Sequence, residues 1–281
     1  MDIYYVNGQF VKEQDALISV NDLSVIRGYG VFDFLRTYNG VPFHLTDHLK
    51  RLQNSARLIG LDLPSSIDDI KALIQKGLSQ SDHREKNIRI VVTGGLSDNG
   101  ITPGETPQLL LMITATTPFP SSYYKEGAKL ITSHVDRFMP GSKTINYIPA
   151  ILCQKDANAQ GAIEAIYVDR DGYLLEGTTS NLFVVRDGRL ITPPCDRVLP
   201  GITRQVVLEL AKNVMEVVQR PIHKDEIRLV DEVLITSSVK EVIPITAVDS
   251  VIIGNGSIGP ISQKIMELFR KKTNPTSRKL F

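Results

Sequence analysis

The sequence predicts an α+β fold in two domains, and three observations support this. The length of 281 residues suits one large or two medium domains, and 42% hydrophobic and 22% charged residues are typical of globular proteins. Apolar residues recur with the strand period of 2 in some segments and with the helix period of 3.6 in others. A Pro/Ser-rich linker at residues 118–122 separates a predicted small domain, residues 1–117, from a larger one, residues 123–281.

The first domain begins with a hairpin. Residues 3–6 and 10–11 are short apolar runs on either side of Asn7-Gly8, a typical two-residue hairpin turn. Residues 18–20 predict a short strand, and residues 21–30 predict a loop rich in turn formers. Thr46 predicts the start of a helix that runs to residue 59. The remaining predicted elements are a helix at 67–78 and strands at 31–38, 88–92 and 109–115.

The second domain mixes strands with three helices. The predicted helices are 148–160, 203–215 and 261–269, which carry apolar residues every three or four positions. The predicted strands are 129–133, 165–169, 173–175, 181–185, 190–191, 232–236 and 251–253.

Charge and cysteine content exclude several classes of protein. A formal net charge of +1 argues against a nucleic-acid partner. The two cysteines lack CxxC spacing, no apolar run reaches membrane-spanning length, and the N-terminus has no basic-then-apolar signal. These features predict a soluble cytoplasmic protein. His44 and His48 stand four residues apart without an evident third ligand, so we expect them at the surface and expect no metal site.

Three segments of the second half contain residues suited to catalysis and to binding a cofactor. Lys143 lies in a short polar loop, Glu176 follows a predicted strand, and residues 201–204 (GITR) open a predicted helix. Each alone is usually an exposed lysine, a solvated glutamate or an ordinary helix start. Together they supply an amine for a Schiff base, a carboxylate for a ring nitrogen and backbone N–H groups for a phosphate. That combination indicates pyridoxal 5'-phosphate (PLP).

At these segments the chain resembles the class IV, or fold type IV, PLP-dependent aminotransferases. This family includes branched-chain aminotransferases, D-amino-acid aminotransferases and aminodeoxychorismate lyases. The resemblance extends from residues 5–8 (YVNG) to about residue 269 and is strongest at residues 176–181 (EGTTSN) and 201–204. It implies a small α/β N-terminal domain, a larger cofactor-binding domain with a barrel-like β core, and a homodimer whose active sites are shared across the interface.

The resemblance also implies the cofactor contacts. Lys143 is expected to form the Schiff base and then to move the proton between the substrate Cα and the cofactor C4′. Glu176 is expected to keep the pyridine nitrogen protonated. The other residues that match cofactor positions of the family are Arg51, Tyr147, Thr178, Thr179, Ile202, Thr203, Ser238 and Val239. By their patterns alone, Arg51 would be a solvated helix flank and Tyr147 a core aromatic residue.

Three residues are candidates for binding the substrate carboxylate. Arg27 and Tyr29 lie in the predicted loop at residues 21–30, which the family places near the neighbouring subunit's active site. Arg89 lies on a predicted strand, on the face opposite Ile88, and matches an arginine of the branched-chain pattern. The alternative for Arg27 is a surface ion pair with Asp22.

The substrate class stays open between several interpretations. Residues 97–100 lack the Arg and His of the usual D-amino-acid enzymes, and Phe32 stands where those enzymes have Tyr. Residues 144–146 shorten a Gly-Gly segment of the branched-chain pattern. Residues 22–30 are more similar to a less common group of D-amino-acid transaminases, which the sequence slightly favours. A branched-chain L-amino-acid aminotransferase is the first alternative and an aminodeoxychorismate lyase the second. A binding protein that has lost the chemistry is disfavoured, because Lys143 and Glu176 are both present.

Overall fold

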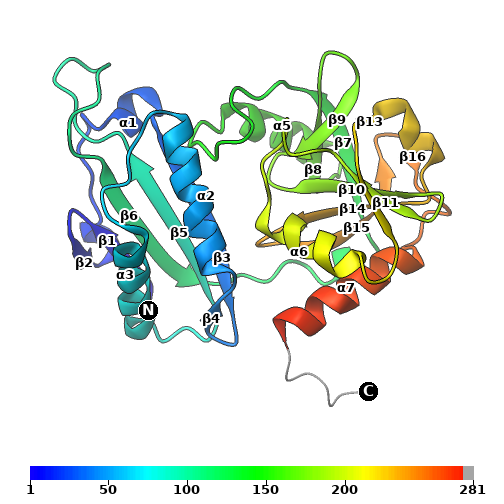
Figure 1. Cartoon of the computed structure of the whole chain (residues 1–281), viewed down its shortest axis with the longest axis horizontal. Coiled ribbons are helices and arrows are strands. Elements are labelled where there is room, and N and C mark those ends of the chain that lie inside the picture. The colour runs from blue at the N-terminus through cyan, green and yellow to red at the C-terminus, as the bar shows by residue number, and fades with distance from the viewer. Residues whose placement is uncertain (275–281) are drawn as a thin grey trace. The chain divides into compact units, whose positions relative to one another are not determined.

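The computed structural model of the chain describes residues 1–274, and these form two compact units (Figure 1). Unit 1 comprises Met1–Thr117 together with Ser142–Asn146. Unit 2 comprises Pro118–Gly141 and the chain from Tyr147 onward. The first change of unit falls at the start of the Pro/Ser-rich linker. The return of residues 142–146 to unit 1 has no counterpart in the sequence patterns, and it gives Lys143 to the unit that precedes the linker.

Unit 1 is built on one antiparallel sheet in the order β2-β1-β6-β5-β3-β4. Asn7 and Gly8 both have positive φ, 52° and 83°, as the predicted hairpin turn requires. The strands of this sheet are β1 (Ile3–Val6), β2 (Gln9–Val11), β3 (Gly30–Tyr38), β4 (Val41–Pro42), β5 (Lys86–Thr93) and β6 (Gln108–Ala115).

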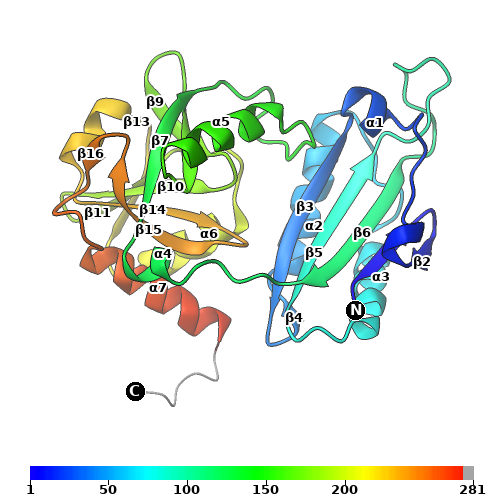
Figure 2. The ribbon, with the colours of Figure 1, turned by 180° about the vertical axis from the view of Figure 1, so that it is seen from behind.

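Two helices cover one face of this sheet, α2 (Leu45–Leu58) and α3 (Ile67–Gln80). They lie in front of the strands in Figure 1, and Figure 2 shows β3, β5 and β6 from the opposite face. The core between helices and sheet consists of fully buried aliphatic side chains, including Leu49, Leu52, Ile70, Ile74 and Ile88. Because side chains alternate along β3, Phe32 and Phe34 belong to the face without helices.

Three local predictions for unit 1 were wrong. Residues 18–20 form no strand, since they bend into the turn before Asp22. The predicted loop at 21–30 contains a short helix, α1 (Leu23–Arg27). Asp22 accepts the Ser24 N–H at its start, and Gly28 ends it in the left-handed region with φ 65°. Helix α2 begins after His44 rather than at Thr46. A 3-10 turn, η1 (Glu13–Asp15), precedes these elements.

Unit 2 contains the remaining strands and helices. Its strands are β7 (Ala128–His134), β8 (Glu164–Val168), β9 (Tyr173–Gly177), β10 (Asn181–Arg186), β11 (Arg189–Thr192), β12 (Glu216–Gln219), β13 (Ile222–His223), β14 (Glu232–Ser237), β15 (Glu241–Val248) and β16 (Val251–Ile252). Its helices are α4 (Ser122–Lys125), α5 (Ile148–Ala159), α6 (Ile202–Ala211), the 3-10 helix η2 (Lys224–Leu229) and α7 (Pro260–Thr273).

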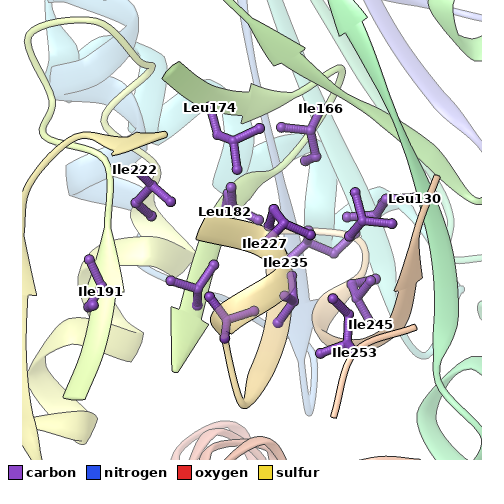
Figure 3. Packing of buried hydrophobic residues seen from close by; sticks show 14 of the residues in the cluster. Leu130, Ile166, Leu174, Leu182, Ile191, Ile222, Ile227, Ile235, Ile245 and Ile253 are labelled. Carbon is purple, nitrogen blue, oxygen red and sulfur yellow. The ribbon is translucent and has the colours of Figure 1, made fainter. Parts of the chain in front are cut away.

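Six of these strands close into a ring, which confirms the expected barrel-like core. The pairing runs β10-β14-β15-β7-β8-β9, and β9 pairs back to β10 through Glu176 and Asn181. The interior is packed with branched aliphatic side chains, among them Leu130, Ile166 and Ile235 (Figure 3). Glu176 therefore stands at the point where the barrel closes.

Candidate active site

The backbone around Lys143 joins the edge of the unit 1 sheet. The Phe32 N–H donates to the Lys143 carbonyl at 2.9 Å, and the Ile145 N–H donates to the Gly30 carbonyl at 3.1 Å. Val31 and Thr144 form the antiparallel bridge between these bonds. Residues 143–145 thus occupy the edge of β3 before the part of that strand that pairs with β4. Lys143 is thereby joined to β3 by backbone hydrogen bonds of the kind that pair two strands.

Helix α2 holds the same segment from the other side. The Lys143 N–H donates to Ser55 Oγ at 3.1 Å, and Ser142 Oγ donates to the Ser55 carbonyl at 3.0 Å. Ser55 and Ser142 are fully buried. Ser55 was not among the predicted site residues. Its position one turn after Leu52, within the apolar stripe of α2, is the only signal that marks it as an inward-facing polar residue.

Two cationic side chains border the ring of Phe32. Lys143 Nζ lies 4.6 Å from the ring centroid, and Arg89 Cζ lies 5.4 Å from it. Arg89 also lies 5.1 Å from the centroid of Phe34, which pairs with it across β3 and β5. Two aromatic contacts restrict the guanidinium to few orientations. Arg89, one of the three carboxylate candidates, thus shares a contact residue with Lys143.

Asp33, His48 and Arg51 form a buried cluster between β3 and α2. Arg51 donates to Asp33 from Nε at 2.8 Å and from Nη2 at 2.9 Å, and His48 Nδ1 lies 2.6 Å from Asp33 Oδ1. The expectation of a surface His48 was wrong, because its ring is 1% exposed and lies against Asp33. The solvated alternative for Arg51 is likewise not found, since Asp33 orients its guanidinium inside the unit.

Burial and the contacts within this cluster shift the pKa values of Asp33 and His48. Burial alone would raise the pKa of Asp33, but Arg51 and His48 outweigh burial and hold that pKa well below its usual range. Burial lowers the pKa of His48, and the nearby charges of Arg51 and Lys143 act in the same direction against the opposing effect of Asp33. These directions favour an ionised Asp33 and a neutral His48 at neutral pH.

Arg27 is the last residue of α1, and Tyr29 follows the C-cap residue Gly28. Arg27 is exposed, and its Nη1 donates to the carbonyl of Ile26 at 2.9 Å. The alternative partner Asp22 is buried and accepts from Ser24 and from Thr93 Oγ1 instead. The Tyr29 hydroxyl donates to the Ile59 carbonyl at 2.9 Å. While that bond holds, the Tyr29 hydroxyl can accept a hydrogen bond from a ligand but cannot donate one to a substrate carboxylate.

Glu176 is held by two partners within unit 2. Its side chain is buried, and Oε1 accepts from Arg137 Nη1 while Oε2 accepts the Leu199 N–H at 3.0 Å. Arg137 also donates to the Pro140 carbonyl at 3.1 Å. Arg137 was not predicted as a site residue, because no local pattern links a residue after β7 with a carboxylate on β9.

The start of α6 lacks a side-chain cap. Gly201 is its N-cap and gives no side-chain hydrogen bond, so the first N–H groups at Ile202 and Thr203 have no such partner. A Cβ on Gly201 would lie 1.9 Å from Asn181 Oδ1, so a larger residue at this position would require the buried Asn181 side chain to move. An uncapped helix start suits a phosphate, and the buried Glu176 carboxylate suits a protonated ring nitrogen. The donor set of this chain therefore fits PLP.

Four of the other candidate residues of unit 2 lie in two turns, and the fifth, Tyr147, lies at the start of a helix. The hydroxyls of Thr178 and Thr179 donate to Glu164 Oε1 at 3.0 and 3.1 Å, so both serve an internal carboxylate. Ser238 and Val239 are half-buried in the turn between β14 and β15. Tyr147 is the N-cap residue of α5 and is also half-buried, which differs from a core aromatic residue.

Two features are absent from residues 1–274. Within that range no group of three His, Cys, Asp or Glu side chains is arranged to hold a metal ion. Among the same residues no helix is both long enough and apolar enough to cross a membrane.

Comparison with known proteins places this geometry in a family. The model of the family "Amino-transferase class IV" matches residues 30–248. A putative branched-chain-amino-acid aminotransferase of Methanocaldococcus jannaschii is 36% identical over 273 residues, which cover 95% of this chain and 94% of the relative. A D-alanine aminotransferase of Bacillus licheniformis is 32% identical over 264 residues, with 92% and 93% covered.

A solved structure agrees with these sequences. A branched-chain amino acid aminotransferase from T.th., solved with pyridoxamine 5'-phosphate, has a TM-score of 0.91 and 30% identity, with 99% of this chain and 95% of that chain covered. The resemblance seen in the sequence, its fold type and its cofactor are thereby confirmed, while branched-chain and D-alanine enzymes both occur among the relatives. The chain belongs to the class IV aminotransferases and is an aminotransferase that uses PLP.

Proposed function

We propose that this enzyme is a D-amino-acid transaminase that moves the amino group of a small D-amino acid to a 2-oxoacid. The observation that supports an α-amino acid as substrate, of either configuration, is the placement of Arg89 and Lys143 against the one ring of Phe32. An α-amino acid offers chiefly its carboxylate for recognition, and an oriented guanidinium beside the reacting amine meets that need. The segment with Arg27 and Tyr29 supports the D-configuration, through its resemblance to the less common transaminases.

The cofactor supplies an aldehyde that captures amines and a ring that accepts an electron pair. Lys143 would hold the cofactor through its amine and would carry the proton between the substrate Cα and C4′. Glu176, oriented by Arg137 and the Leu199 N–H, would keep the proton on the ring nitrogen. Tyr147, Thr178 and Thr179 would complete the surroundings of the ring. The phosphate would be bound by Arg51, Ile202, Thr203, Ser238 and Val239.

A branched-chain L-amino-acid aminotransferase is the second candidate. It is favoured by the aromatic side chains of Phe32 and Phe34 beside Arg89, which offer an apolar surface to an aliphatic substrate. The relative from Methanocaldococcus jannaschii bears a branched-chain name. In this interpretation Arg89 alone holds the carboxylate.

A donor panel separates these functions. Purified enzyme is assayed with both enantiomers of alanine, glutamate, leucine and valine, against pyruvate and 2-oxoglutarate. The proposal predicts that D-alanine or D-glutamate exceeds its L-enantiomer in kcat/KM by about 10²-fold or more, a difference of about 3 kcal/mol in transition-state binding. Faster transfer from L-leucine or L-valine would establish the second candidate. Release of pyruvate from a chorismate-derived amine would indicate the lyase.

The enzyme is further proposed to act as a cytoplasmic homodimer. Unit 1 exposes apolar side chains around α1, including Leu17, Val20, Val25, Leu96 and Ile101. The Asp22–Leu96 bridge connects the two segments that carry them. An exposed apolar group of this kind marks an interaction surface. Sedimentation should give the mass of two chains, and Val25→Glu should shift the enzyme toward the mass of one.

A further inference from the structure

We propose that Lys240 is a positioning residue for the cofactor, acting through Glu164. Its ammonium joins the turn that follows Glu176 to the turn that carries Ser238 and Val239. The inference rests on the proposed function, which assigns both turns to PLP, and it concerns how those turns are held. The predicted consequence is a weaker hold on PLP when the link is removed.

The ion pair at its centre is buried. Lys240 is 6% exposed and Glu164 is fully buried, and Lys240 Nζ lies 2.6 Å from Glu164 Oε2. The same ammonium donates to Thr179 Oγ1 at 2.6 Å. Lys240 therefore contacts the turn after Glu176 directly and also through Glu164.

Glu164 accepts hydrogen bonds from three consecutive residues of that turn, Thr178, Thr179 and Ser180. Besides the two threonine hydroxyls, it accepts the N–H of Thr179 and, at 2.9 Å, the hydroxyl of Ser180. There is no spare room, because a Cβ on Gly177 would lie 2.4 Å from Ser180 Oγ and 2.7 Å from Glu164 Oε1. Burial would raise the pKa of Glu164, but Lys240 and these donors outweigh burial and lower it, so the carboxylate stays charged.

The backbone of Lys240 is fixed as well. Its N–H donates to Ser237 Oγ at 3.1 Å, and its carbonyl accepts from the Tyr124 hydroxyl at 3.1 Å. Ser238 and Val239 therefore lie between two tethered residues. A displacement of the Lys240 side chain would be passed to them over one or two peptide units.

Stability alone does not account for such a pair. Removing two charges from water is costly, and a well-packed apolar pair of similar size is often as stable as a buried ion pair. A buried ion pair does fix direction, because each oxygen of Glu164 has its own donors and the ammonium accepts few geometries. Orientation of the two turns is the property that this pair supplies and that an apolar pair would not.

The test measures PLP affinity in a double variant, Glu164→Gln with Lys240→Met, which leaves no unpaired charge inside the barrel. Lys264→Met, on the exposed side of α7, is the matched control. PLP dissociation constants are measured by equilibrium dialysis, and thermal unfolding midpoints are measured on the apoprotein. The proposal predicts a dissociation constant raised about tenfold or more, with amino-donor KM within about twofold of the parent value at saturating PLP.

Three results would overturn the proposal. An unchanged dissociation constant, whether or not the apoprotein is less stable, would make the pair purely structural. Tagging of Lys240 by borohydride in the parent enzyme would instead make it the attachment site and would refute the proposed function itself. Should the double variant fail to fold, Ser237→Ala removes one tether of Lys240 alone and is expected to raise the dissociation constant about fivefold. No change in that variant would also refute the inference.

Discussion

Asp33 and Arg51 are joined by two parallel hydrogen bonds, Nε to Oδ2 at 2.8 Å and Nη2 to Oδ1 at 2.9 Å, inside unit 1. The arginine that the family resemblance assigns to the phosphate is therefore oriented by a contact within unit 1. A pre-oriented guanidinium loses little conformational entropy on binding, which favours a tight phosphate contact.

Asp33→Asn should destabilise the protein by about 3–5 kcal/mol, because it leaves the Arg51 charge buried without its partner. The depressed pKa of Asp33 adds a pH signature. A carboxyl with a lowered folded-state pKa contributes stability above its unfolded-state pKa of about 4 and loses it as pH falls toward the folded-state value. The parent should thus lose stability below about pH 4, and the variant should lose less.

Urea unfolding at pH 7 and at pH 3 measures both effects. Asp98→Asn, in an exposed loop, is the control and should change neither value. Equal pH dependence in the parent and in Asp33→Asn would show that Asp33 is not an ionised partner of Arg51.

Ser55→Ala tests the anchoring of Lys143 on α2. The Lys143 N–H would lose its acceptor at a buried position, which costs about 1–3 kcal/mol of stability. If this loss of stability is local to residues 142–146, exchange of the Lys143 amide with deuterium should accelerate while amides at the centre of β5 stay protected. Unchanged exchange at Lys143 would mean that the bonds to β3 hold the segment by themselves.

Much of the fold was predictable because local patterns dominate it. The Asn7-Gly8 hairpin, both long helices of unit 1 and β8 to β11 agree with their apolar periods and turn residues. Strand β15 was missed although it is one of the six barrel strands, where it pairs with β14 and β7. It contains Pro244, which argues against a central strand, but its pairing with β7 begins only after that proline, at Ile245.

The candidate site was predictable only in part. Lys143 and Glu176 were chosen as candidates by residue type and order, and Arg51 by the family resemblance. The residues that contact them, Ser55, Arg137 and Asp33 respectively, were not predicted, since these tertiary contacts are encoded by no periodic pattern. A single Asp inside a strand or a single Ser inside a helix is ordinary until its neighbour is known.

Glu176→Gln tests the electron-accepting state of the cofactor. A neutral amide cannot stabilise a protonated ring nitrogen, so the proton-transfer step should slow by about 10²-fold, or about 3 kcal/mol of barrier. PLP should remain bound. Stopped-flow single turnovers with the best donor measure the step directly. A rate equal to that of the parent would place the ring carboxylate elsewhere.

Arg27→Ala and Arg89→Ala locate the substrate carboxylate. Loss of a charge-assisted contact worth about 1.5–3 kcal/mol should raise the donor KM by about 10–10²-fold without changing PLP content. The D-amino-acid proposal predicts an effect in both variants. If only Arg89→Ala has an effect, the carboxylate site belongs to Arg89 alone and the branched-chain function gains support. Arg57→Ala, on the exposed end of α2, is the control.

The attachment of PLP to Lys143 is tested most directly by reducing the holoenzyme with borohydride and mapping the labelled peptide. The segment paired with β3 and anchored on Ser55 predicts a single pyridoxyl label on Lys143, together with loss of transamination and of the absorbance at about 410–420 nm in Lys143→Ala. A label on Lys155 or Lys240, with Lys143 unmodified, would contradict it.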